Sequence, residues 1–228
     1  MIARMTTLFV RAARGFATLA ALALTFGLLH GCGKPEPPTI NLYLALQRGD
    51  LHQFERHLAW GTEINAPLPD GRTPLQMAAA DGREVFVRQL LARGADPLAK
   101  GPDGHNALES ALLNGRVQVM PLLVPRGAKL DASALLLVAA ENGSQDRDVL
   151  GFLLQRGAYL ETRDAAGDTP LLIAVRRNDR VLVRHLLDRG ADPFVTDAGG
   201  RSALAIAEAM RHEDVARLLR RQGAAPMR

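Results

Sequence analysis

The residue types that most often perform chemistry are few and scattered in this chain. Its 228 residues include six histidines and one cysteine, Cys32. His52 and His57 are five residues apart, whereas side chains meet on one helix face when they are three or four apart, so this pair is poorly placed to share a metal ion. The other histidines show no ligand spacing either. We therefore predict that the histidines lie on the surface and that the protein binds no metal.

The sequence also lacks the short motifs that mark catalytic centres. It contains no G-x-S-x-G, no H-E-x-x-H, no phosphate-binding loop and no cysteine pair. Scattered serine, histidine and aspartate residues could in principle meet in space, but no motif indicates that a nucleophile and a base do so. We predict that the protein is not an enzyme and that it needs no cofactor.

The charge balance argues against nucleic acid as a partner. The chain carries 28 lysines and arginines against 24 acidic residues. Three of the basic residues (Arg4, Arg11 and Arg14) lie in an N-terminal segment without acids, which leaves 25 basic against 24 acidic residues elsewhere. A nucleic-acid footprint requires a concentrated basic face, and here the arginines alternate with acids. We predict no nucleic-acid binding.

Most of the chain is organised by one repeated unit, seen most clearly from Asp70 to Lys100 as DGRTPLQMAAADGREVFVRQLLARGADPLAK. Asp70 and Gly71 are typical of a turn. Thr73 can cap the helix that follows, and Pro74 suits the first turn of that helix. A second apolar stripe then runs to Gly94, a typical helix stop. The unit is predicted to be a turn, two helices and a return loop.

The unit recurs six times along the sequence. Taking Leu75 as the marker, the intervals between markers are 33, 33, 28, 35 and 33 residues. An alanine follows each marker after three residues, where a small side chain lets two helices approach closely, and a glycine, asparagine or arginine follows after seven. The markers are Leu42, Leu75, Leu108, Leu136, Leu171 and Leu204, and the alanines are Ala45, Ala78, Ala111, Ala139, Ala174 and Ala207.

This pattern resembles the ankyrin repeat, whose period is about 33 residues and whose signature is T-P-L-H-x-A. Gln76 stands where the family prefers histidine, so the hydrogen bonds of that histidine must be replaced or absent. The resemblance implies an all-α solenoid of about six helix-turn-helix units with short β-hairpin fingers. The domain spans residues 39–228, and its repeats are 39–67, 70–100, 103–130, 131–163, 166–196 and 199–226.

Three repeats depart from the pattern. The first has no T-P-L turn, as expected of a capping repeat, and Trp60 at its end either covers the core or contacts a partner. In the third repeat Pro121 falls inside the second helix and should kink that helix or shift its start. The fourth has lost about five residues of its finger and gained two in the turn between its helices. It is either a drifted repeat or a bend where a partner docks.

Residues 1–31 have the features of a signal peptide. Three arginines precede a 14-residue apolar run from Phe16 to Leu29, shorter than the ~20 residues that span a bilayer. The following Leu29-His30-Gly31-Cys32 resembles the bacterial lipoprotein box, which implies cleavage before Cys32 and lipidation of that residue. An ordinary secretory leader and an uncleaved anchor are the alternatives. Residues 32–38 would form a Pro-rich tether, and the resemblance implies the outer membrane, facing the periplasm.

The resemblance to ankyrin repeats implies a concave binding surface made of finger tips and first-helix faces. Outward-pointing positions lie five and six residues after each marker. We expect Arg163, Arg176 and Arg177 to be the main anchors, because arginine is enriched at interface hot spots. The predicted partner-binding residues are Arg48, Asp81, Lys100, Asn114, Glu141, Asn142, Arg163, Arg176, Arg177 and Met210.

The predicted function is therefore protein binding by a monomeric, membrane-anchored module in the periplasm. One role is that of a scaffold or protector of an envelope enzyme. The other is that of an immunity protein, which would neutralise a toxic effector. A neutraliser should bind tightly and block the active site of its partner, whereas a scaffold should leave activity intact. Binding of a small ligand would need a lined pocket, which the sequence does not indicate.

Overall fold

The computed structural model describes residues 35–124, 130–144 and 146–223. The predicted signal peptide (1–31) and Cys32 lie outside these ranges. The chain divides into two units, and the one that begins at Pro38 contains every helix described below. None of these helices is both long enough and apolar enough to cross a membrane.

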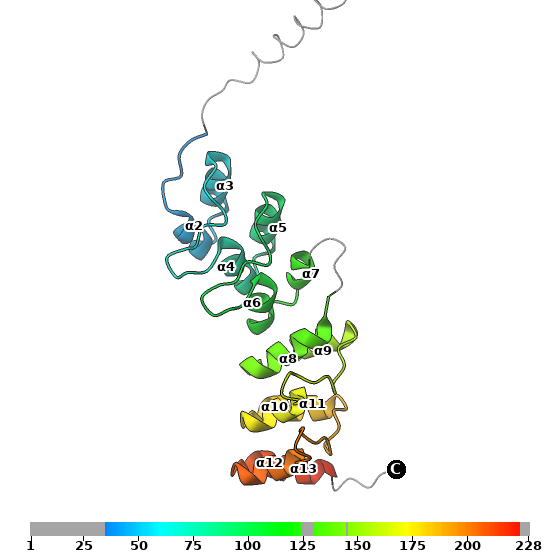
Figure 1. Cartoon of the computed structure of the whole chain (residues 1–228). Coiled ribbons are helices and arrows are strands. Elements are labelled where there is room, and N and C mark those ends of the chain that lie inside the picture. Colours follow the sequence, from blue (N-terminus) through cyan, green and yellow to red (C-terminus); the bar gives the residue numbers. More distant parts are fainter. Residues whose placement is uncertain (1–34, 125–129, 145, 224–228) are drawn as a thin grey trace, which may run out of the picture. The chain divides into compact units, whose positions relative to one another are not determined.

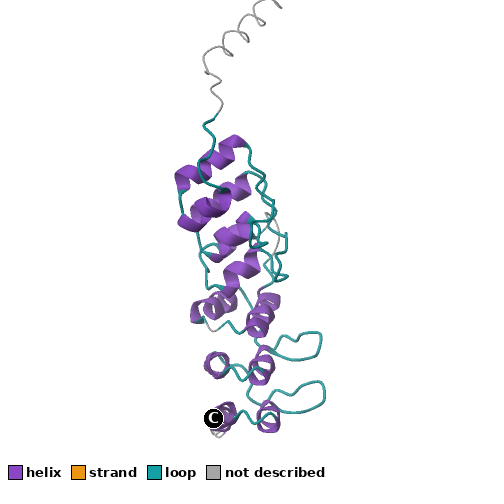
Figure 2. Cartoon of the chain, turned by 90° about the vertical axis from the view of Figure 1, so that its left-hand side faces the viewer, coloured by secondary structure: helices purple, strands orange, loops and turns teal. Residues whose placement is uncertain are grey.

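The described residues form twelve helices in six consecutive pairs (Figure 1). We call the members of each pair the first and the second helix, and the loop that leads to the next pair the finger. The loops extend to one side of the helices (Figure 2). The pairs are α2 (Leu42–Arg48) and α3 (Leu51–Trp60), α4 (Pro74–Ala80) and α5 (Glu84–Ala92), α6 (Ala107–Leu113) and α7 (Met120–Leu123), α8 (Ala132–Asn142) and α9 (Arg147–Gln155), α10 (Pro170–Arg176) and α11 (Arg180–Asp188), and α12 (Ala203–Ala209) and α13 (Glu213–Gly223).

The first helices begin where the sequence predicts. The hydroxyl of Thr73 accepts a hydrogen bond from the backbone N–H of Gln76 at 3.2 Å, and Pro74 occupies the first turn of α4. Thr169 and Ser202 cap α10 and α12 in the same way. Such caps satisfy N–H groups that have no partner inside the helix.

Gln76 replaces the histidine that is usual in the family motif. Its side-chain oxygen accepts from the backbone N–H of Thr73 at 2.7 Å. Its amide nitrogen donates to the carbonyl oxygens of Ala99, at 3.3 Å, and His105, at 2.6 Å, in the next finger. The side chain is 1% exposed. Gln76 therefore joins the start of α4 to the finger that follows it.

The alanine column is buried within the stack of helices. Each first helix packs against the next one along the series from α2 to α12. All six alanines are buried, with at most 4% of their surface exposed. A larger side chain at these positions would push the first helices apart, because protein interiors are close-packed.

The turn between the two helices of a pair uses a left-handed backbone conformation. Gly49, Gly82 and Gly115 have φ between 69° and 71° there, where glycine carries no steric cost. The fifth and sixth repeats place Asn178 (φ 56°) and Arg211 (φ 59°) at the same point. Asparagine tolerates this region, whereas arginine adopts it at a cost.

The fingers are tight turns rather than paired strands. In the fingers that lead to α4, α6, α10 and α12 an aspartate carboxylate accepts the backbone N–H two residues further on, as Asp70 does from Arg72 and Asp103 does from His105. Such side-chain bonds compete with a strand ladder for the same N–H groups. Within the described ranges the only β-pairing is an isolated bridge between Thr196 and Ser202. The expected β-hairpins are thus reduced to turns.

The irregular third and fourth repeats follow the sequence signals. Helix α7 has four residues and begins at Met120, twelve residues after Leu108, whereas α5 and α11 begin nine residues after their markers. Pro121 sits in its first turn, so the predicted shift of the helix start is confirmed. In the fourth repeat, Asp146 at the end of the lengthened turn caps α9 through the N–H groups of its second and third residues.

The expectation that the histidines lie on the surface was wrong for His57. This residue is 5% exposed. Its Nδ1 lies 2.9 Å from the hydroxyl of Thr62, and its Nε2 lies 2.8 Å from the carbonyl oxygen of Ile40. The ring therefore fastens the residues before α2 to the end of α3. Trp60, by contrast, is about half exposed, at 48%.

Candidate protein-binding surface

The predicted partner-binding residues are spread along what we call the first-helix face. This face consists of the positions five and six residues after each marker leucine together with the finger residues Lys100 and Arg163. Nine of the ten predicted residues are exposed, and Arg176 is half-buried. Since the alanines of the same helices are buried and their marker leucines are buried or partly buried, each first helix has one face for packing and one that remains accessible.

Several of these residues also terminate their own helices. Asp81 and Arg177 are the C-terminal cap residues of α4 and α10, and Met210 is that of α12. The amide nitrogens of Asn114 and Asn142 donate to carbonyl oxygens one turn earlier, at 2.8 and 2.9 Å. These bonds satisfy carbonyls that a helix end leaves without a partner. The exposed positions are therefore held in place by local hydrogen bonds.

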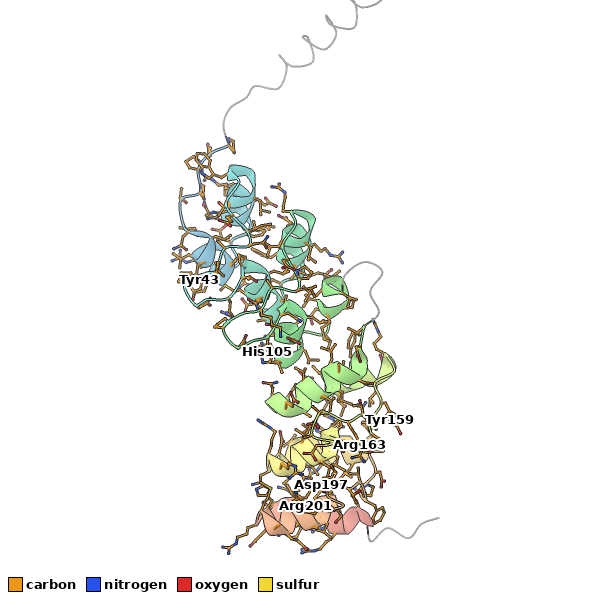
Figure 3. All side chains as sticks on the ribbon, in the orientation of Figure 1. Tyr43, His105, Tyr159, Arg163, Asp197 and Arg201 are labelled. Carbon is orange, nitrogen blue, oxygen red and sulfur yellow. The ribbon has the colours of Figure 1, made fainter. Side chains whose placement is uncertain are left out.

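Arg176 lies at the centre of an ion-pair network between the fifth and sixth repeats. Its guanidinium donates to the carboxylate of Asp168 at 2.6 Å and to that of Asp197 at 2.9 Å. Asp197 also pairs with Arg201 at 2.8 Å. Arg163, Asp197 and Arg201 lie close together on the fingers (Figure 3). Asp168 and Asp197 are both buried, with 7% of their surface exposed, and buried carboxylates require charged or hydrogen-bonding partners.

The hydrogen bonds to Asp197 strongly favour its ionised form. The backbone N–H of Arg201, the guanidinium of Arg201 and the guanidinium of Arg176 lower the pKa of Asp197 from 3.8 to about 2. The bond from Arg176 to Asp168 in turn raises the pKa of the Arg176 guanidinium. The network is therefore fully charged at neutral pH and holds two fingers in a fixed arrangement.

Arg163 makes a second link between these two fingers. Its Nη1 donates to the carbonyl oxygen of Gly167 at 2.5 Å and to that of Thr196 at 3.0 Å. Of the three predicted anchors, Arg163 and Arg176 are therefore occupied within the molecule, while Arg177 is exposed. The three side chains lie in the same region, but they differ in how freely they can contact a partner.

Sequence reasoning overlooked the carboxylates that hold these arginines. Asp168 precedes Thr169 of the T-P-L turn, and Asp197 stands 29 residues later in the next finger. Both residues look like ordinary turn residues in the sequence. Asp168 lies three residues before its marker leucine and Asp197 lies seven residues before the next one, so the two aspartates occupy different repeat positions and no repeated pattern marks the network.

The part of the chain that the structure describes holds no group of three or more histidine, cysteine, aspartate or glutamate residues placed to bind a metal ion. A hollow of about 580 Å³ lies between α5 and α7, where the shortened α7 leaves Leu91 and Leu122 partly exposed. A second hollow of about 420 Å³ lies beside α12 and α13 at the last repeat. Neither was indicated by the sequence motifs.

Comparison with known proteins identifies the family. A family model described as ankyrin repeats (3 copies) matches residues 42–134 and 136–228. The chain belongs to the ankyrin-repeat family. The two matches together cover nearly all of the six repeats, so the assignment does not depend on one unit alone.

Among characterised proteins, the chain is similar to the ADP-ribosylation factor GTPase-activating protein AGD2 of Arabidopsis thaliana. The identity is 43% over 56 residues, which is 25% of this chain and 7% of that protein. The chain thus corresponds to a small part of the length of that relative. The likeness supports an ankyrin-repeat segment and carries no information on the activity of the whole plant protein.

Two solved ankyrin-like structures are similar over most of the chain. The ankyrin repeat domain of Bcl-3, a member of the IκB protein family, matches with a TM-score of 0.60 and 28% identity, covering 83% of this chain and 88% of that one. A chain in the complex of the predatory endopeptidase Bd0816 of Bdellovibrio bacteriovorus with the immunity protein Bd3460 matches with a TM-score of 0.58 and 25% identity. That match covers 79% of this chain and 96% of the other.

Ankyrin repeats are protein-interaction modules, and the arrangement described above fits that use. Stacked first helices and fingers present a continuous row of exposed side chains on a rigid support. The row is chemically mixed, with acidic, basic, amide and thioether groups one repeat apart. Such a surface can recognise an extended area of a folded partner.

Proposed function

We propose that this ankyrin-repeat protein binds another protein through its first-helix face while anchored to the outer membrane of a bacterium, facing the periplasm. The observation that carries the proposal is that each first helix has one packed face and one exposed face. Its alanine is buried in every repeat and its marker leucine is buried or partly buried, whereas the position six residues after the marker is exposed in every repeat. Side chains that are not needed for packing are thus available for recognition.

The anchor is proposed from the sequence of residues 1–38. Acylation of Cys32 would fix the chain to the membrane, because each buried methylene contributes about 0.8 kcal/mol and several acyl chains act together. The tether from Gly33 to Pro38 is short and rich in proline, which favours an extended spacer. The repeats would then work close to the membrane surface as a monomer.

Two roles for the partner are consistent with this surface. The protein acts as a scaffold or protector of an envelope enzyme, or it acts as an immunity protein that neutralises a toxic effector. The second role is favoured by one specific observation, the likeness to the complex of an endopeptidase with an immunity protein. That match extends over 96% of the other chain, so it reflects the whole repeat domain rather than one unit.

The test is affinity capture with residues 38–228 from envelope extract and from cells that deliver effectors. Two variants with equal changes in charge are compared. In the first, Arg48→Glu and Arg177→Glu alter the first-helix face. In the second, Arg184→Glu and Arg221→Glu alter exposed positions of second helices. A single partner that is lost only with the first variant supports the proposal, and equal capture by all three proteins contradicts it.

An activity assay on the captured partner separates the two roles. An immunity protein should abolish activity at a one-to-one ratio, whereas a scaffold should leave activity unchanged. The anchor is tested separately in cells by incorporation of labelled palmitate into the full chain. Cys32→Ser should remove the label, and retention of the label by this variant would refute lipidation at Cys32.

A further inference from the structure

An arginine cluster lies on the second helices of the last two repeats, away from the first-helix face. Helix α11 contributes Arg180 and Arg184, and helix α13 contributes Arg217 and Arg221. Together with Asp214 and Leu218 these residues line a shallow cleft of about 70 Å³ between the two helices, which are in contact. Each pair of arginines is four residues apart, so both members project from the same side of their helix.

Most of this positive charge is not balanced within the molecule. Arg217 pairs with Asp214 at 2.5 Å. For Arg180, Arg184 and Arg221, no hydrogen bond or salt bridge of the side chain is present among the residues that the structure describes. Some exposed arginines elsewhere are paired, as in the pairs Arg88–Glu84 and Arg220–Glu208. Three neighbouring guanidinium groups therefore attract an external anion.

The chemistry of the cluster favours phosphate. The planar guanidinium group matches the geometry of phosphate oxygens and donates two parallel hydrogen bonds to them. All four arginines are exposed, and the cleft is too small to enclose an organic ligand. An open array of this kind fits an extended anionic surface better than a small molecule, which is normally bound in a larger and more enclosed site.

Apolar side chains beside the cluster point to a lipid surface in particular. Val181 on α11 is 43% exposed, and Phe194 in the next finger is 62% exposed. The ring of Phe194 lies close to Gly223 at the C-terminal end of α13, about 3.5 Å from the position that a Cβ atom on this glycine would occupy. Arg221 lies in the same last turn of α13. Exposed aromatic and aliphatic residues next to arginines are typical of protein surfaces that lie in the headgroup region of a bilayer.

We propose that the second-helix face of the fifth and sixth repeats docks onto the phosphate headgroups of an anionic phospholipid bilayer. Arg180, Arg184 and Arg221 bind the phosphates, while Phe194 and Val181 enter the interfacial layer. This contact is separate from the first-helix face and from the lipid anchor. It would orient the repeats on the membrane, with the first-helix face left for the protein partner.

The experiment is sedimentation of residues 38–228, which lack Cys32, with vesicles. One set contains phosphatidylglycerol and phosphatidylcholine in equal amounts, and the other contains phosphatidylcholine alone. We expect binding to the anionic vesicles only, weakened at about 0.5 M salt because screening shortens the range of the attraction. Removing one basic residue near such a surface lowers binding about fivefold, so Arg184→Gln with Arg221→Gln should lower it about 25-fold.

The matched control is Arg48→Gln with Arg177→Gln, which changes the net charge equally but on the first-helix face. This control should bind anionic vesicles within about twofold of the unmodified domain. Far-ultraviolet circular dichroism of each protein confirms that it is folded. The proposal is overturned if the unmodified domain does not bind anionic vesicles, if both variants lose binding equally, or if neither does. Because a different pair of arginines tests protein capture, the two proposals fail separately.

Discussion

The replacement of histidine by Gln76 makes a quantitative prediction about the second repeat. Gln76→Ala removes three hydrogen bonds from a side chain that is almost fully buried, one to the N–H of Thr73 and two to carbonyl oxygens of the following finger. The N–H and both carbonyl groups are left without that partner. The variant should therefore destabilise the start of α4 and the finger together.

The magnitude follows from the separate contributions. Each bond contributes about 1 kcal/mol, and the 3.3 Å bond to Ala99 less than the 2.6 Å bond to His105. The bond from the N–H of Thr73 to Gln76 is a helix-capping interaction, and its loss costs about 1 kcal/mol. With the small cavity that remains, the free energy of unfolding should fall by roughly 2–4 kcal/mol.

Urea unfolding followed by circular dichroism measures this change, with Gln47→Ala as the control. Gln47 is exposed on α2, so its substitution should change the free energy of unfolding by less than about 0.5 kcal/mol. Gln76→His restores the family motif and should remain within about 1 kcal/mol of the unmodified protein. A loss below about 1 kcal/mol for Gln76→Ala would refute the role assigned to this side chain.

Three further predictions concern the network, the alanine column and the turn. The pKa of Asp197 is lowered from 3.8 to about 2, so its contribution to stability is complete above pH 3.8 and is lost as pH falls towards 2. Between pH 3.8 and 2 the urea midpoint of the unmodified protein should fall more steeply than the urea midpoint of Asp197→Asn. Equal dependence of the two midpoints on pH would contradict the assignment. Ala174→Leu should lower the free energy of unfolding by about 1–3 kcal/mol through overpacking, whereas Ala205→Leu at an exposed site should change it by less than about 0.5 kcal/mol. Arg211→Gly should raise it by about 0.5 kcal/mol in the same assay, because glycine relieves the left-handed backbone (φ 59°) at some cost in chain entropy; a decrease would show that the Arg211 side chain contributes more than the strain it causes.

The repeat could be predicted from the sequence because packing and backbone conformation fix residue type at particular positions. Ala45 and Ala174 lie at helix contacts that admit only a small side chain, and both have no exposed surface. Gly82 lies at a left-handed turn. The shifted start of α7 was also indicated, because Pro121 lacks the N–H that a helix interior requires. Such constraints act within one repeat and recur in the next, which makes them visible as columns.

Interactions between side chains of different repeats were not predictable in the same way. Arg176 occupies an outward position of α10, so its sequence context suggested a free surface charge. Its pairing with Asp168 and Asp197 depends on how two fingers curve beside one another. The burial of His57 likewise depends on the path of the residues before α2, which bring the carbonyl of Ile40 to the ring. Neither arrangement recurs in other repeats, so comparing equivalent repeat positions in the sequence could not reveal it.

The occupied arginines change how a binding experiment should be designed. Arg163 donates to backbone oxygens through Nη1, and Arg176 uses Nε and Nη2, so each retains some of its five N–H donors. A side chain that is already ordered loses little entropy when a partner binds, which suits both residues as contacts. Removing either one would, however, also weaken the links between fingers, and a loss of binding would then have two causes. Arg177 is exposed at the end of α10, so its substitution reports on recognition with less disturbance of the fold.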